Sequence, residues 1–168
     1  LWQHLFLENE THTLFMRHLA ENMLQASRPP IKKFQWHMPG FMKITPPPFN
    51  IKREATAPLD AAIRLLALND SITETHTLGR LQKIMEKGHM PKSLADAVHN
   101  AFDFILRLRF RLEYAHKGEN RDDSHHVDVG QLLPLQVKNL KEALKTIYQL
   151  QDYAFKQVTE TSVPWTMR

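Results

Sequence analysis

The densest group of potential metal ligands lies in one short polar segment. Residues 122–128 contain the carboxylates of Asp122, Asp123 and Asp128 and the imidazoles of His125 and His126. Imidazole and carboxylate groups together suit zinc or a similar ion. Polar surface loops often have this composition without a metal, so we predict no metal site. If a metal does bind, we expect Asp123, His125, His126 and Asp128 to hold it.

A second group consists of cations that could contact phosphate. Arg107 and Arg111 are one helical turn apart and therefore share a face, and Lys117 follows beyond the apolar stripe of the same segment. Guanidinium and ammonium groups form charge-assisted hydrogen bonds with phosphate oxygens. The alternative is a solvated or salt-bridged surface. We predict these three residues as candidates for binding a nucleotide or substrate.

Arg109 and His116 form a third constellation. They are seven positions apart, nearly two helical turns, so both lie on one face of a helix. A cation and an imidazole can stabilise a phosphate and move a proton during attack by a ribose 2′-hydroxyl. The spacing resembles the arginine and histidine pair of HEPN ribonucleases, which are four-helix bundles that often partner nucleotidyltransferases. This resemblance implies a metal-independent ribonuclease as an alternative function.

The overall composition is typical of a soluble globular protein. A chain of 168 residues suits one domain with a sizeable core, and the absence of cysteine excludes thiol catalysis and thiolate metal sites. No apolar run approaches the ~20 residues that span a bilayer, and residues 1–4 lack the features of a secretory signal. We expect a cytoplasmic location. The net charge of +4 tolerates an anionic partner, but without clustered lysines it does not predict nucleic-acid binding.

Apolar residues recur at spacings of three and four, which predicts helices throughout most of the chain. We expect helices over residues 2–25 (with a break near 8–11), 58–68, 75 or 77 to 87, 91–117 and 133–154. Gly88 and Gly118 suit helix ends, and Thr75 or Thr77 suits a helix start. Long amphipathic segments joined by short turns favour an all-α antiparallel bundle of about five helices.

The segment of residues 29–49 cannot be a regular helix. It contains Pro29-Pro30, Pro39-Gly40 and the triplet 46–48. Short extended pieces at residues 41–45 and 49–53 are predicted to pair as one short β-hairpin. The aromatic residues Phe34, Trp36, Phe41 and Phe49 are expected to attach this connection to the bundle rather than to stack on bases.

Four motifs occur in order along the chain. They are Phe49-Asn50-Ile51-Lys52 followed by residues 57–68, Thr77-Leu78-Gly79-Arg80-Leu81, Leu106-Arg107-Leu108-Arg109 followed by Gly118, and Leu140-Lys141 followed by Leu150-Gln151. Together they resemble the nucleotidyltransferase-like bacterial signal-transduction proteins, a family similar to the uridylyltransferases that modify a nitrogen-regulatory protein. The resemblance extends from Ile31 to Phe155. It departs from the family pattern at Gly79, Phe110, Arg111 and the pair Asp122-Asp123.

The resemblance implies that Lys52, Arg64 and Arg80, which lie within the motifs, take part in nucleotide or substrate binding. Their alternative role is structural, because arginine stems next to apolar stripes often tie helices together. Family members often carry CBS or cyclic-nucleotide-binding domains before the transferase core. Residues 1–168 are therefore expected to form a single helical domain at the C-terminal end of a longer multidomain protein.

A nucleotidyltransferase of this type needs a glycine-serine turn that holds the triphosphate and closely spaced carboxylates that hold two metal ions. The sequence contains no Gly-Ser pair. We therefore predict a non-catalytic domain without a cofactor, which helps to form the nucleotide and substrate cleft of a core that uses Mg²⁺ and a nucleoside triphosphate. The expected partners are the preceding domains of the same chain, and a dimerising or regulatory module is the alternative.

Overall fold

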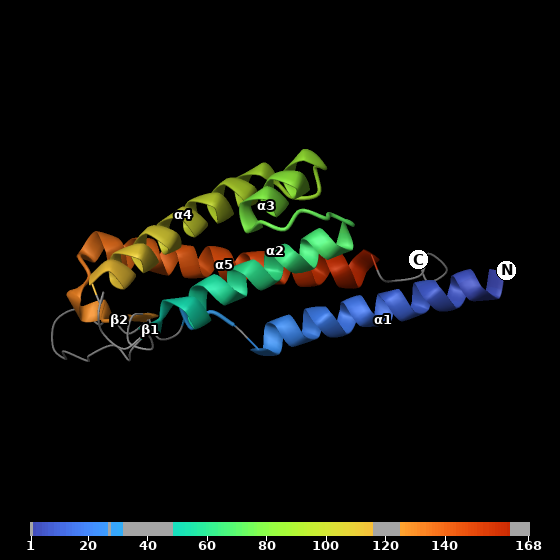
Figure 1. The fold of residues 1–168 in the computed structure, drawn as a ribbon, viewed down its shortest axis with the longest axis horizontal. Coiled ribbons are helices and arrows are strands. Elements are labelled where there is room, and N and C mark those ends of the chain that lie inside the picture. The colour runs from blue at the N-terminus through green and yellow to red at the C-terminus, as the bar shows by residue number, and fades with distance from the viewer. Residues whose placement is uncertain (1, 27, 32–48, 116–124, 162–168) are drawn as a thin grey trace.

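The computed structural model describes residues 2–26, 28–31, 49–115 and 125–161. It contains five α-helices: α1 (Trp2–Ala26), α2 (Ala57–Asn69), α3 (Thr77–Glu86), α4 (Lys92–Ala115) and α5 (Pro134–Thr161). The helices lie side by side in an elongated bundle (Figure 1). The predicted all-α class is therefore confirmed. No helix in the described ranges is long and apolar enough to cross a membrane.

Helix α5 is the centre of the bundle. It packs against α4, α2 and α1, and Figure 1 shows it running between α4 and α2. Its buried stripe follows the predicted spacing, and Leu140, Leu144, Ile147, Leu150 and Ala154 are fully buried. Burial of each large aliphatic side chain contributes roughly 1.5–3 kcal/mol. The same helix carries its polar side chains on the remaining faces, so one element both forms the core and supplies a surface.

Helix α1 is continuous, and the predicted break near residues 8–11 is wrong. This stretch is polar but contains neither proline nor glycine, and its glutamates have good helix propensity. Of the four residues predicted to share one face, Met16 and Met23 are buried and Leu19 is partly buried, whereas His12 is exposed. Arg28, just after α1, holds the helix end to α5 because its Nη1 lies 2.8 Å from Oδ1 of Asp152.

A two-stranded sheet forms between segments far apart in the sequence. Strand β1 (Phe49–Asn50) pairs antiparallel with β2 (His126–Val127), so that Phe49 is opposite Val127 and Asn50 is opposite His126. The predicted extended piece at Phe49 is confirmed, and β2 is a pairing partner of it; the segment 41–45, with which it was predicted to pair, lies outside the described residues. Phe49 is fully buried, as expected for a residue that attaches this segment to the bundle.

Strand β1 is short because a helix starts directly after it. The side chain of Asn50 accepts a hydrogen bond from the backbone N–H of Arg53 (2.9 Å), and Glu54 accepts one from the backbone N–H of Asn50 (2.8 Å). This reciprocal capping satisfies amides of the first helical turn. A π-helical turn at Lys52–Thr56 then leads into α2. Pro58 has no N–H to donate to the preceding turn, which is compatible with this wider local geometry.

The joint between α3 and α4 was predicted correctly. Gly88 has a φ of 69° and follows the last turn of α3, where the backbone N–H of His89 bonds to the carbonyl of Ile84 (3.3 Å). A residue with a Cβ is disfavoured at this positive φ. Nδ1 of His89 also lies 2.9 Å from Oδ2 of Asp70, whose side chain is only 8% exposed. The α3–α4 turn is thereby attached to the end of α2.

Candidate functional site

Two of the predicted cations, Arg64 and Arg80, converge on the carboxylate of Asp60. Nη2 of Arg64 lies 2.8 Å from Oδ2 of Asp60, and Nη1 of Arg80 lies 3.9 Å from Oδ1. The hydroxyl of Thr77 donates a 2.5 Å hydrogen bond to the same Oδ1. The motifs around α2 and α3 therefore meet in one polar cluster on the surface of the bundle.

The two arginines differ in what they can do. The side chain of Arg80 is only 16% exposed, and its Nε donates a 2.8 Å hydrogen bond to the carbonyl of Glu74. It ties the segment before α3 to α2, which is the structural role considered above. Arg64 is 59% exposed, so its remaining N–H groups face solvent and can meet an anion.

Glu74, which the sequence patterns did not single out, organises the start of α3. Its carboxylate accepts hydrogen bonds from the backbone N–H groups of Thr75 (2.7 Å) and His76 (3.1 Å). These bonds, the one from His76 first, hold the pKa of Glu74 below its ordinary value. The N-cap residue of α3 is His76 and has no side-chain cap, so the predicted capping by Thr75 or Thr77 is wrong. Thr77 is the first residue of the helix, and its hydroxyl donates its hydrogen bond to Asp60 instead.

Arg107 and Arg111 lie one turn apart on α4, as predicted. The side chain of Arg107 is 79% exposed, and its Nε lies 2.8 Å from Oδ2 of Asp103. Arg111 is exposed and makes no ion pair with any other residue of the described ranges. Exposed pairs such as Arg107–Asp103 are weak, about 0.3–0.5 kcal/mol, so a phosphate can compete for this guanidinium.

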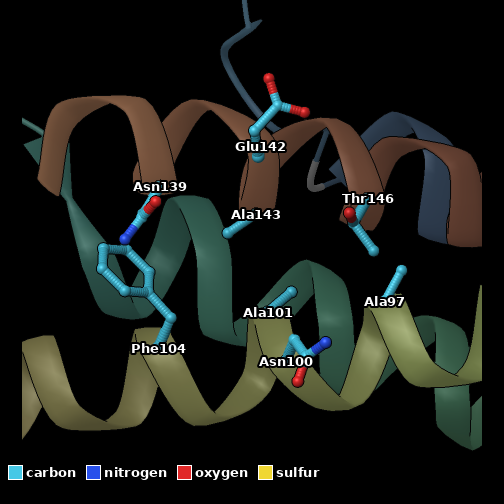
Figure 2. Close-up of a pocket in the computed structure, with 8 residues that line it drawn as sticks. All are labelled: Ala97, Asn100, Ala101, Phe104, Asn139, Glu142, Ala143 and Thr146. Carbon is cyan, nitrogen blue, oxygen red and sulfur yellow. The ribbon is translucent and has the colours of Figure 1, made fainter. Parts of the chain in front are cut away.

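A groove of about 360 Å³ runs between α4 and α5, and we call it the α4–α5 groove. Figure 2 shows the side chains that line it. They are Ala97, Asn100, Ala101 and Phe104 from α4, and Asn139, Glu142, Ala143 and Thr146 from α5. Alanines on both helices leave the space open, because their side chains are too short to fill the seam. The groove is therefore a consequence of small residues at matched positions of two antiparallel helices.

The groove leads toward the predicted phosphate-binding arginines. Arg111 is seven positions after Phe104 on α4, so both lie on nearly the same face. Seven residues of helix correspond to roughly 10 Å. Arg107 lies between them at one edge of this face. A groove with an apolar floor, followed on the same helix face by two cations, is compatible with a nucleotide.

None of the polar groove residues was predicted from the sequence. Asn100, Asn139 and Thr146 lie next to the apolar stripes of their helices, where polar residues are common. The sequence does place small residues close to these asparagines: Ala97 and Ala101 near Asn100, and Ala143 near Asn139. Small residues leave a groove only if the two helices face each other, and a single sequence does not reveal which helices do so.

Arg109 is engaged by a carboxylate. Its Nε donates a 2.7 Å hydrogen bond to Oε1 of Glu113, and Nδ1 of His125 lies 3.9 Å from the same oxygen. The structure thus brings Arg109 near His125. His116, the residue predicted to act with Arg109, and Lys117 lie outside the described residues. The ribonuclease alternative therefore stays a prediction.

The candidate metal ligands have separate roles. Oδ1 of Asp128 accepts a hydrogen bond from the backbone N–H of Gly130 (2.9 Å) and Oδ2 accepts one from Nε2 of Gln131 (3.0 Å), which starts a 3₁₀ turn at Val129–Gln131. His126 belongs to β2, and Asp123 lies outside the described residues. Within the described part of the chain, no three His, Asp or Glu side chains are placed to hold a metal ion.

Lys52 is placed away from α3. It is exposed on the π-helical turn before α2, next to β1 and at the end of the bundle where α4 terminates. The predicted cations thus lie on different elements: Arg64 and Arg80 share Asp60, Lys52 lies on the π-helical turn before α2, and Arg107 and Arg111 lie on α4. Of these elements, α4 is the one that lines the groove.

Comparison with known proteins identifies the chain at the level of its family. No curated protein and no solved structure matches it. Residues 13–158, most of the chain, match a family model described as "Putative nucleotidyltransferase substrate binding domain", and the chain therefore belongs to this family.

Proposed function

We propose that this domain is non-catalytic and forms one wall of the nucleotide and substrate cleft of a nucleotidyltransferase core. The observation that carries the proposal is the position of Arg107 and Arg111 on α4, one and two turns beyond the groove residue Phe104, in a domain whose family is described as substrate binding. Two exposed guanidinium groups one turn apart suit the oxygens of a polyphosphate. The neighbouring groove offers space for the rest of the molecule.

The chemistry itself is assigned to the core. Transfer of a nucleotidyl group needs metal ions that stabilise the attacking and leaving oxygens of the phosphate. The carboxylates that hold such ions, and the glycine-serine turn that holds the triphosphate, are expected in the core. The role of this domain is to orient the nucleotide and to exclude water from one side of it, since orientation alone lowers the barrier of a reaction between bound partners.

The proposal includes the setting of the domain. We place it after the transferase core of a cytoplasmic, bacterial signal-transduction protein in which CBS or cyclic-nucleotide-binding domains respond to an effector. The support for this setting is the order of the four sequence motifs and the family match over residues 13–158. In this arrangement the domain meets its main partner within one chain, and Mg²⁺ enters with the nucleoside triphosphate.

Calorimetric titration of the 168-residue chain with nucleoside triphosphates and Mg²⁺ tests the cleft role. We expect binding that weakens as salt is added, because phosphate contacts are screened. Arg111→Ala should weaken binding about fivefold or more, in line with a charge-assisted hydrogen bond of ~1–2 kcal/mol. Lys156→Ala removes an equal charge from an exposed position of α5 that does not line the groove, and is the matched control.

Equal effects of the two substitutions would argue that binding depends only on net charge, and the proposal would fail. Loss of binding in Arg64→Ala, with Arg111→Ala unchanged, would move the cleft to the Asp60 cluster. Thermal unfolding of each variant must match the parent chain, so that a change in affinity is not a change in folding.

A further inference from the structure

We infer that the α4–α5 groove is a binding site for an adenine base. The inference rests on the proposed function, because it names the part of the nucleotide that the groove recognises. It is carried by the chemical character of the groove lining, which includes no cation, is partly aromatic and carries two carboxamides among the described residues. The ring lies in the groove between α4 and α5, and the phosphates of the same nucleotide extend toward Arg107 and Arg111.

Among the described residues, the side chains that point into the groove are uncharged. Glu142 is the only ionisable one of these residues that lines the groove, and Figure 2 shows its carboxylate pointing away from the floor. That carboxylate is bound to Nζ of Lys145 at 2.9 Å. Phosphate is therefore disfavoured inside the groove, because no described residue that lines it carries a cation. An uncharged part of a ligand fits there, and the charged part belongs at the arginines.

The shape of the groove suits a flat ring. Ala97, Ala101 and Ala143 provide a floor without protruding side chains, so a planar group can approach both helices closely. The ring of Phe104 stands at one end and offers an aromatic contact, and stacking of a base on an aromatic side chain is worth about 1–3 kcal/mol. The volume of about 360 Å³ is at the lower end of ligand pockets, which is enough for a base with its sugar.

The polar side chains select the base. Asn139 points from α5 toward Phe104, and Asn100 lies on the α4 side (Figure 2). Neither carboxamide makes a side-chain hydrogen bond to another residue of the described ranges, so both can serve a ligand. A carboxamide offers one donor and one acceptor side by side. Adenine is the base whose two hydrogen-bonding edges each present an acceptor next to a donor, N1 with N6 and N7 with N6.

The register of α4 connects the base to the phosphates. Arg107 is three positions and Arg111 is seven positions beyond Phe104, which corresponds to roughly 5 and 10 Å along the helix. A sugar and a chain of phosphates that leave the groove along α4 cover a comparable length. One nucleotide can thus occupy the groove with its base and reach the guanidinium groups with its phosphates.

Titration of the ¹⁵N-labelled 168-residue chain with adenosine, and then with the triphosphates of adenosine, guanosine, uridine and cytidine, tests the inference by NMR. We expect adenosine to shift the signals of Asn100, Ala101 and Asn139, and the adenine nucleotide to bind about tenfold more tightly than the other three, as one well-made pair of base contacts predicts. Asn139→Leu should reduce this preference to about twofold or less. Gln149→Leu, on an exposed position of α5 outside the groove, should leave it intact.

Three results overturn the inference and are distinguishable from failure of the proposed function. If all four triphosphates bind equally and Arg111→Ala weakens them all, the phosphate site stands and the groove does not read adenine. If adenosine produces no shifts at millimolar concentration, or shifts residues of the Asp60 cluster instead, the groove is not the base site. Retention of the adenine preference in Asn139→Leu would also contradict the inference. Phe104→Leu removes the aromatic ring but keeps an apolar side chain of helix-compatible shape, and it provides an independent check on stacking.

Discussion

The hydroxyl of Thr77 lies 2.5 Å from Oδ1 of Asp60, although the two residues are 17 positions apart and belong to different helices. This bond joins the start of α3 to the first turns of α2. Arg64 and Arg80 approach the same carboxylate, so Asp60 is the common acceptor of the cluster. Its contribution to stability can be separated from any contribution to ligand binding.

Asp60→Ala is expected to lower the free energy of unfolding by about 1.5–3 kcal/mol, because hydrogen bonds to a charged group are lost and two cations lose their partner. Thr77→Ala should cost about 1 kcal/mol. Urea unfolding of both single variants and the double variant gives the coupling, which we expect to be at least about 0.5 kcal/mol. Asp96→Ala, at an exposed position of α4, is the control. Strictly additive effects would contradict a direct Asp60–Thr77 bond.

Gly79 is a position where the usual benefit of alanine in a helix should be absent. A Cβ at residue 79 would lie 2.7 Å from Cγ and 2.8 Å from Cδ of Glu74, so the Glu74 side chain would have to leave its backbone partners. In other helix interiors, glycine to alanine stabilises by roughly 0.5–1 kcal/mol. We expect Gly79→Ala to be neutral or destabilising in the parent chain, yet stabilising by this amount in a Glu74→Ala background. Chemical denaturation of the four proteins decides between these outcomes, and an equal gain in both backgrounds would show that Glu74 is not displaced.

The carboxylate of Glu74 should make folding depend on pH. Hydrogen bonds from the backbone of His76 and then Thr75 lower its pKa in the folded chain from an ordinary value of 4.5, and the positive charge of Arg80 acts in the same direction. The charged form is therefore favoured by folding, and its stabilisation is present above pH 4.5 and is lost as the pH falls through the lowered pKa. Glu74→Gln should be less stable than the parent near neutral pH, and the two proteins should converge in acid. A difference in unfolding free energy between the two proteins that does not change with pH would exclude the Glu74 carboxylate as the cause of the pH dependence.

The core of α5 should tolerate truncation poorly. Ile147 is fully buried where α5 meets its neighbouring helices, so Ile147→Ala is expected to cost about 2–5 kcal/mol and Ile147→Val about 0.5–1.5 kcal/mol. Leu135→Ala is the matched control, because this leucine is 66% exposed near the start of the same helix, and its effect should remain within about 0.5 kcal/mol. Denaturant unfolding measures all three. A small effect at residue 147 would mean that the bundle repacks around α5.

The sequence predicted the helices well, and the reason is visible in α4 and α5. Leu140, Leu144 and Ile147 repeat at spacings of four and three and are all fully buried. Such a repeat is a local property of the chain, because it requires only that one face of a helix meets something apolar. The break in α1 was predicted wrongly for the same reason: a polar stretch was interpreted as a boundary, although its residues are compatible with a helix.

The candidate site was predicted in part. The motifs identified Arg64, Arg80 and Arg107, and helical spacing identified Arg111. Neither showed that the first two share Asp60 or that α4 and α5 leave a groove. Asn100 and Asn139 were not predicted, because neither belongs to a recognisable spacing of chemical groups. They line one groove only when α4 and α5 pack in one particular register.

By itself, the sequence determined that this is a bundle of amphipathic helices and which family it resembles, since helix periodicity and short motifs are written in residues close together in the chain. The tertiary structure alone decided that β1 pairs with β2, that Thr77 reaches Asp60, and that alanines of two helices coincide to leave a groove. These relationships join residues separated by long stretches of chain. They depend on the relative rotation and register of packed elements, which only the burial of the whole core determines.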